Sequence, residues 1–178
     1  MQNLPDLLAM AILVLSVFVI ALLIFWLWRG LKRVFSGSKP SSKEELPENG
    51  IVVDGSNVMY WNGDPETRVL RRVIDKLKEL GFQPFVVFDA SVGYRLSDRY
   101  LDDVTMAAIV DLPAKQVLVV HKGQVADEVI LMFAKESGYR VVTNDRFRDW
   151  SVKFPLVKGK GRLVKGAWRE GNVVLHGL

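Results

Sequence analysis

The sequence predicts a three-layer α/β domain that follows one membrane-spanning helix. Two observations support this prediction: an uninterrupted apolar run near the N-terminus and, from residue 50 onward, short apolar runs that alternate with stretches of helical periodicity. With 178 residues the chain has room for one domain of ordinary size and some additional segments. A third observation, acidic residues placed where strands end, bears on function.

The apolar run covers residues 7–28 and reads LLAMAILVLSVFVIALLIFWLW. At roughly 1.5 Å of rise per residue, a helix of this length crosses the roughly 30 Å hydrocarbon core of a bilayer. The short segment 1–6 holds no Lys or Arg, whereas Arg29, Lys32 and Arg33 follow the run. Because basic residues stay on the cytoplasmic side, we expect a single-pass cell-membrane protein with its N-terminus outside. A cleaved signal peptide has a shorter apolar region, and a long buried helix is the remaining alternative.

Residues 29–49 are interpreted as a juxtamembrane linker, because they mix Ser, Gly, Pro and charges without a periodic apolar face. The domain then covers residues 50–178 and is expected in the cytoplasm. Its strands are apolar on both faces, which is typical of a sheet that helices cover on both sides. Four strands are expected, at Gly50–Val53, Gln83–Phe88, Gln116–Val120 and Tyr139–Thr143.

Helices are expected between these strands. The first begins with Asp64 as N-cap and Pro65 in its first turn, and ends at Gly81. A second helix, or a pair of short helices, is expected over residues 97–110, and a third over residues 127–136. Strands that alternate with helices imply right-handed crossovers and a mainly parallel sheet.

The segment from residue 151 onward is basic, with six Lys or Arg against one Glu. Residues 162–167 and 173–176 are expected to pair through a turn at residues 170–172. A net charge of +4 and a pI near 9.4 favour an anionic partner, either a membrane or a nucleic acid. The chain has no cysteine, which excludes disulfides, zinc-thiolate sites and cysteine nucleophiles.

Four acidic residues fall at one predicted edge of the sheet. In an open parallel sheet, ligands bind outside the carboxyl ends of the strands. Asp54 ends the first strand, Asp145 follows the fourth, and Asp127 opens the third helix. Asp149 lies four residues after Asp145, so the two share a helical face if a helix begins there. Asp89, which follows the second strand, is a further candidate or a turn residue.

Like charges gathered in one place raise each other's pKa, and a divalent cation relieves this repulsion. Oxygen ligands without Cys or His favour Mg²⁺ or Mn²⁺, and such ions generate a hydroxide and stabilise a phosphoryl group during transfer. Asn57 is placed to orient Asp54 or to bind a water or phosphate oxygen. The alternatives are that Asp127 and Asp145 are helix N-caps, and that Asp149 is a surface acid.

The stretches VVDGSNVMYW and ADEVILMFAKESGYRVVTNDRFRDW resemble the NYN branch of the PIN-like nucleases, most closely the Zc3h12a (Regnase)-type ribonuclease domain. The resemblance covers roughly residues 51–150. It implies a PIN-like fold, a metal site at Asp54, Asp127, Asp145 and Asp149 with Asn57 beside it, and Mg²⁺-dependent endoribonuclease activity on single-stranded or loop RNA. The family often has two adjacent acids where this chain has Ala126 and Asp127, which leaves open whether one or two metal ions bind.

RNA contacts are expected from basic residues that border the acidic edge. The expected residues are Arg95, Arg148, Lys158, Lys160, Arg162 and Lys165. Their phosphate contacts give affinity and salt dependence without sequence preference. Trp150 and Trp168 are candidates for stacking on bases, and Phe147 is expected to pack in the core.

Two other functions fit the same residues. One is a non-catalytic RNA-binding or scaffolding module of this fold, which Ala126 and the basic tail favour. The other is a nuclease that acts on DNA, because nothing in the sequence reads a 2′-hydroxyl. Besides RNA and the lipid bilayer, a second copy of the chain or a membrane protein is considered as a partner.

Overall fold

The protein is described from residue 46 to residue 178 in a computed structural model. The predicted external N-terminus, the predicted membrane helix over residues 7–28 and most of the predicted linker lie outside these residues. Among the described residues, no helix is both long and apolar enough to cross a bilayer.

The centre of the domain is a six-stranded sheet with the order β3-β2-β1-β4-β5-β6. Its strands are β1 (Gly50–Asp54), β2 (Gln83–Phe88), β3 (Val117–Val119), β4 (Arg140–Val142), β5 (Leu163–Arg169) and β6 (Asn172–His176). The first five strands are parallel and β6 is antiparallel to β5. β2 and β3 follow one another on one side of β1, and β4 then pairs with β1 on the opposite side. The carboxyl ends of β1 and β4 are therefore the point where a ligand is expected.

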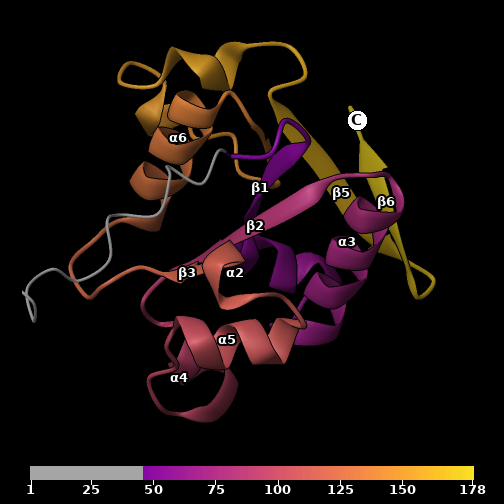
Figure 1. The fold of residues 1–178 in the computed structure, drawn as a ribbon, viewed down its shortest axis with the longest axis vertical. Coiled ribbons are helices and arrows are strands. Elements are labelled where there is room, and N and C mark those ends of the chain that lie inside the picture. Colours follow the sequence, from indigo (N-terminus) through magenta and orange to yellow (C-terminus); the bar gives the residue numbers. More distant parts are fainter. Residues whose placement is uncertain (1–45) are drawn as a thin grey trace, which may run out of the picture. The chain divides into compact units, whose positions relative to one another are not determined.

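Helices cover both faces of this sheet (Figure 1). On one face lie α2 (Gly55–Met59), α3 (Thr67–Glu79) and α5 (Asp103–Val110), and on the other lies α6 (Ala126–Ser137). Successive β1 side chains alternate between the two layers, as the pleat requires. Ile51 and Val53 pack toward α3, whereas Val52 packs toward α6. The three-layer α/β architecture is confirmed.

Shorter elements complete the domain. These are α4 (Val92–Ser97) and the 3-10 helices η1 (Tyr60–Asn62), η2 (Ala114–Gln116), η3 (Arg148–Trp150) and η4 (Pro155–Lys158). Of the one helix or pair predicted over residues 97–110, α5 lies within that range, whereas α4 ends at its first residue. The α2 helix is absent from the sequence-based prediction, because its five residues are too few to show a period.

One local prediction is wrong, and two of the alternatives are excluded. Asp64 is not a helix N-cap, because α3 begins at Thr67 with Glu66 in the cap position. Asp127 is not an N-cap either, since α6 begins one residue earlier and Val125 precedes it. No helix begins at Asp145: Phe147 has a positive φ of 47°, which interrupts any helix before η3.

The predicted C-terminal hairpin is confirmed. Glu170 and Gly171 form its two-residue turn, and both have a positive φ, at 49° and 81°. β5 pairs with β4 only through Leu163 and Val164, so its remaining residues pair with β6 alone. The hairpin therefore continues past the carboxyl end of β4 and forms a side wall at that edge of the sheet.

Candidate active site

Asp54 is the last residue of β1 and the N-cap of α2. Its Oδ1 accepts a hydrogen bond from the backbone N–H of Asn57 at 3.1 Å, and its Oδ2 accepts one from the hydroxyl of Thr143 at 2.9 Å. The next residue is Gly55, where a Cβ atom would lie 2.5 Å from the Phe88 ring. The turn that follows Asp54 therefore favours glycine, because the Phe88 and Val86 side chains of β2 fill the space that a Cβ atom would occupy.

Thr143 joins the ends of β1 and β4. Its side chain is fully buried, and while it donates to Asp54 it accepts a hydrogen bond from the backbone N–H of Asp145 at 3.0 Å. One hydroxyl group thus fixes the Asp54 carboxylate and the start of the loop that carries Asp145. Both carboxylates are held at the same edge of the sheet as a result.

Asn57 has a fixed orientation. Its Oδ1 accepts hydrogen bonds from the Trp61 indole N–H at 3.1 Å and from the backbone N–H of Asn144 at 2.9 Å. Because both neighbours are donors, the atom between them is the oxygen and the other is the amide nitrogen. That nitrogen makes no hydrogen bond within the described residues, so it is a donor available to a ligand beside Asp54.

The pKa of Asp54 is raised from 3.8 to about 6, mainly because the carboxyl group is buried. The negative charges of Asp127 and Asp145 contribute to this rise, whereas the hydrogen bonds from Asn57 and Thr143 oppose it. The structure therefore brings three of the predicted acids into electrostatic contact. A cation bound among these carboxylates would offset their mutual repulsion.

Asp127 lies half-buried in the first turn of α6. Burial raises its pKa, Asp145 raises it further, and a hydrogen bond from the Trp150 indole lowers it. That bond joins Trp150 Nε1 to Asp127 Oδ2 at 3.2 Å. Trp150 also packs on the Phe154 ring, with centroids 6.0 Å apart. A predicted base-stacking residue is thus engaged with an acid of the site.

Asp145 is exposed, and its Oδ1 accepts a hydrogen bond from the backbone N–H of Phe147 at 2.6 Å. This short turn places the Phe147 ring in the core, where it is 2% exposed, as the sequence predicts. Asp149 is also exposed, on η3. Asp149 is not among the groups that shift the pKa of Asp54 or of Asp127. Its role as a metal ligand stays a prediction.

Residues 46–178 hold no group of three Asp, Glu or His side chains that converges on a common metal position. The chemistry of the donors nevertheless suits a hard cation, because all three are carboxylates. Two of them keep one oxygen that accepts no hydrogen bond from another described residue, namely Asp127 Oδ1 and Asp145 Oδ2. The residues present therefore have the ligand type that Mg²⁺ or Mn²⁺ prefers, although their side chains do not converge on one point.

Two basic residues from the sequence-based prediction lie at this edge. The Arg95 guanidinium donates to the hydroxyls of Ser91 at 3.1 Å and Tyr60 at 3.1 Å, beside the end of β2. Lys165 donates through Nζ to the backbone oxygen of Asp145 at 2.6 Å. Arg148 is exposed on η3, next to the acidic edge.

Arg162 has a different environment from the one expected. Its guanidinium donates to the backbone oxygens of Ala134, Gly138 and Tyr139 at 2.9 to 3.3 Å. These carbonyls end α6 and precede β4, at the amino edge of the sheet. Arg162 therefore caps the C-terminal end of α6, at the edge of the sheet opposite the acids. Lys158 and Lys160 are exposed in the segment that leads to Arg162.

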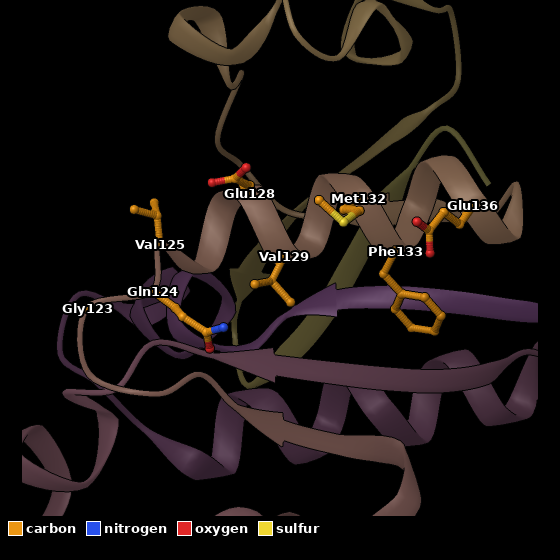
Figure 2. A pocket seen from close by; sticks show the side chains of 8 residues that line it. All are labelled: Gly123, Gln124, Val125, Glu128, Val129, Met132, Phe133 and Glu136. Carbon is orange, nitrogen blue, oxygen red and sulfur yellow. The ribbon is translucent and has the colours of Figure 1, made fainter.

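A pocket of about 540 Å³ lies along α6, outside the acidic edge (Figure 2). Figure 2 shows Val129 and Phe133 directed from α6 toward the sheet and Glu128 directed away from it. The pocket lining includes Glu128 but not Asp127. The candidate site is therefore an open edge of the sheet and not this pocket.

The fold and the site define an α/β protein with acidic residues at the switch point of a parallel sheet. The chain belongs to the Zc3h12a-like ribonuclease NYN domain family, whose sequence profile matches residues 47–174. This confirms the family that the sequence motifs indicate. Comparison with curated proteins gives no match.

Two solved structures of nuclear RNase P 2 from Arabidopsis thaliana, described as proteinaceous or protein-only, are similar in fold. One has a TM-score of 0.54 and 18% identity, over 71% of this chain and 29% of that chain. The other has a TM-score of 0.56 and 16% identity, over 99% of this chain and 37% of that chain. This chain thus spans about a third of their length or less, and the likeness concerns the fold.

Sequence reasoning missed three residues that shape the site. Thr143, Asn144 and Trp61 hold Asp54 and Asn57 in place. Their roles depend on which strands are neighbours, and β1 and β4 are far apart in the sequence. The adjacency of Thr143 to the TNDRFRD motif is the one signal that could have drawn attention to it.

Proposed function

We propose that this chain is a membrane-anchored, divalent-metal-dependent endoribonuclease that hydrolyses phosphodiester bonds in single-stranded or loop RNA. The observation that carries the proposal is the electrostatic contact among Asp54, Asp127 and Asp145 at the switch point of the sheet. Membership of a ribonuclease domain family supports the same reaction. Asp149 is proposed as a further acid of the site.

In this proposal the three carboxylates hold Mg²⁺ or Mn²⁺. Such an ion, when bound, supplies a hydroxide nucleophile and neutralises charge on the phosphate. Thr143 keeps the Asp54 carboxylate directed to the site, and Trp150 does the same for Asp127. Asn57 donates from its amide nitrogen to the attacking water or to a phosphate oxygen, because its oxygen is already engaged.

Substrate contact beyond the reacting phosphate comes from basic residues of the carboxyl edge. Arg95 and Arg148 are proposed to bind phosphates on either side of the acids. Lys158 and Lys160, which precede Arg162 in the chain, are proposed as further phosphate contacts outside this edge. Contacts of this type add affinity that falls with salt concentration and do not select a sequence.

The test uses the full chain in detergent with end-labelled single-stranded RNA. We expect cleavage with Mg²⁺ or Mn²⁺, none in EDTA, and none after Asp54→Asn. Asp75→Asn is the matched control, because Asp75 is an exposed acid of α3. RNA that stays intact with either ion, or an Asp54→Asn variant that cuts as fast as Asp75→Asn, would contradict the proposal. A matched DNA oligonucleotide tests the alternative substrate.

A second candidate function is a non-catalytic RNA-binding module. It is favoured by the observation that the acids of residues 46–178 do not converge on one metal position. Salt-sensitive RNA binding that persists in EDTA, with no cleavage products after long incubation, would identify this function. Cleavage that requires a divalent ion would exclude it.

Membrane anchoring is proposed from residues 7–28 alone, with the nuclease domain in the cytoplasm. The expected result is that the full chain stays in the membrane fraction after a carbonate wash. Removal of residues 1–28 should release it. A full chain that is found in the wash would contradict the anchor.

A further inference from the structure

Lys165 lies on β5, one residue past the last pairing of β5 with β4. Its side chain is half-buried, and its Nζ donates to the backbone oxygen of Asp145 at 2.6 Å. The lysine thus reaches across the end of β4 to the loop that carries one of the site acids. Most lysines extend their ammonium group into solvent.

The surrounding contacts make this position rigid. The Asn144 side chain donates to the Gly166 oxygen at 2.8 Å and accepts from the Gly166 N–H at 3.1 Å. A Cβ atom at Gly166 would lie 2.2 Å from the Trp61 ring, so β5 and η1 are also packed closely. The strand that carries Lys165 is therefore fixed to both the Asp145 loop and the element that orients Asn57.

The charge of Lys165 lies beside Asp145. Its ammonium interacts electrostatically with Asp145, and Arg146 is the neighbouring positive group. An ammonium has three N–H donors, and the bond to the Asp145 carbonyl uses one of them. Two donors remain for a ligand that carries negative charge and approaches the acidic edge.

On the basis of the proposed function, we propose that Lys165 binds the reacting phosphate itself. Its ammonium donates a hydrogen bond to a non-bridging phosphate oxygen, next to the carboxylates that hold the metal ion. Negative charge on these oxygens must be neutralised as the phosphoryl group is transferred, and a fixed cation at that place stabilises the transition state. No step of acid or base catalysis is assigned to Lys165.

Other basic residues of the described chain are less suited to this role. Arg162 is directed to backbone carbonyls at the opposite edge. Arg95 is bound to Ser91 and Tyr60 beside β2, away from the Asp145 loop. Lys165 combines a position beside Asp145 with a hydrogen bond to the backbone.

The test compares three variants of the full chain in detergent. Lys165→Gln keeps an N–H donor for the Asp145 carbonyl and removes the charge. Lys165→Ala removes both. Lys135→Ala is the control, because Lys135 is an exposed lysine in the last turn of α6. Each is assayed for kcat and KM on single-stranded RNA with Mn²⁺.

We expect kcat to fall by about 10²-fold in both Lys165 variants, as for the loss of a group that stabilises a developing oxyanion. Ethylammonium added to the buffer should restore at least part of kcat in Lys165→Ala and none in the other proteins. A structural role alone would not produce this rescue. A kcat within about threefold of Lys135→Ala for both variants would overturn the inference.

RNA binding in Ca²⁺, without turnover, keeps the inference testable if the wild-type chain cuts no RNA. The slope of log K against log salt should become less steep by about 0.7 in Lys165→Gln, which is the loss of one phosphate contact on a single strand. Loss of cleavage in the wild type and in Lys135→Ala would refute the proposed function alone. An unchanged slope in Lys165→Gln would refute the role of Lys165.

Discussion

The ends of β1 and β2 lie side by side in the sheet and each leads into an aspartate, yet the two acids differ in state. Burial and the charges of two other acids raise the pKa of Asp54 to about 6. Burial also acts on Asp89, but hydrogen bonds from Ser56 and Ser91 and the charge of Arg95 outweigh it and lower its pKa. The charge of Asp89 is thus balanced by the protein, whereas that of Asp54 is not. Position at a strand end alone does not identify the acid that a metal would bind.

The largest expected difference between the two ends is in RNA cleavage. Asp54→Asn should lower the cleavage rate by about 10³-fold or more, equivalent to about 4 kcal/mol of transition-state stabilisation. Asp89→Asn should lower it by less than about tenfold, because Asp89 is engaged in a local turn with Ser91. Single-turnover rates at saturating Mg²⁺ measure both. Equal losses of cleavage rate in the two variants would contradict the different roles given to Asp54 and Asp89.

The next effect is on stability, and the two acids should act with opposite sign. The folded pKa of Asp54 lies above its unfolded value, so its contribution to stability is present below about pH 4 and is lost as the pH rises through about 6. The cost at pH 7 is roughly 3 kcal/mol. Asp54→Asn should therefore raise the thermal midpoint at pH 7 and leave it little changed at pH 4.

Asp89 has a lowered pKa, so its contribution is present at neutral pH and is lost as the pH falls through its folded pKa. Asp89→Asn should lower the thermal midpoint at pH 7. Circular dichroism melts of the full chain at pH 4 and pH 7, without divalent ions, measure both variants. If Asp54→Asn is less stable than the wild type at pH 7, the account of Asp54 as an uncompensated acid is wrong.

A smaller effect is expected from the hydrogen bond between Trp150 and Asp127. Trp150→Phe removes the indole donor and should slow cleavage by about five- to thirtyfold, since such a bond to a charged group contributes about 1 to 2 kcal/mol. Tyr139→Phe is the matched control, because it removes a phenol bond to the Pro47 carbonyl away from the acids. Similar rates for the two variants would assign Trp150 a packing role only.

Much of the fold is encoded in local patterns. β2 has the predicted ends, and the other strands differ from prediction by one or two residues, because apolar runs bounded by turn residues define a strand within its own segment. The helix starts were less accurate. The sequence around Asp64 has the chemistry of an N-cap, yet Glu66 takes that position and its side chain makes no capping bond.

The candidate site was accessible from the sequence only in part. Asp54, Asp127 and Asp145 were grouped because parallel strands end at one edge, and in the structure the charges of Asp127 and Asp145 act on Asp54. The hydroxyl of Thr143 and the orientation of Asn57 depend on contacts between residues 87 to 89 positions apart in the chain. The inward direction of Arg162 likewise depends on where α6 ends, which composition does not reveal.

The central claim is that Asp54 and its neighbours bind a divalent cation. Calorimetric titration of the full chain with Mn²⁺ at pH 6, in two buffers of different ionisation enthalpy, tests it most directly. The account predicts one bound ion with release of about half a proton, because Asp54 is about half protonated at that pH and the ion displaces the proton. Asp54→Asn should bind no Mn²⁺, whereas Asp89→Asn should bind as the wild type does. Binding that survives Asp54→Asn unchanged would contradict the claim.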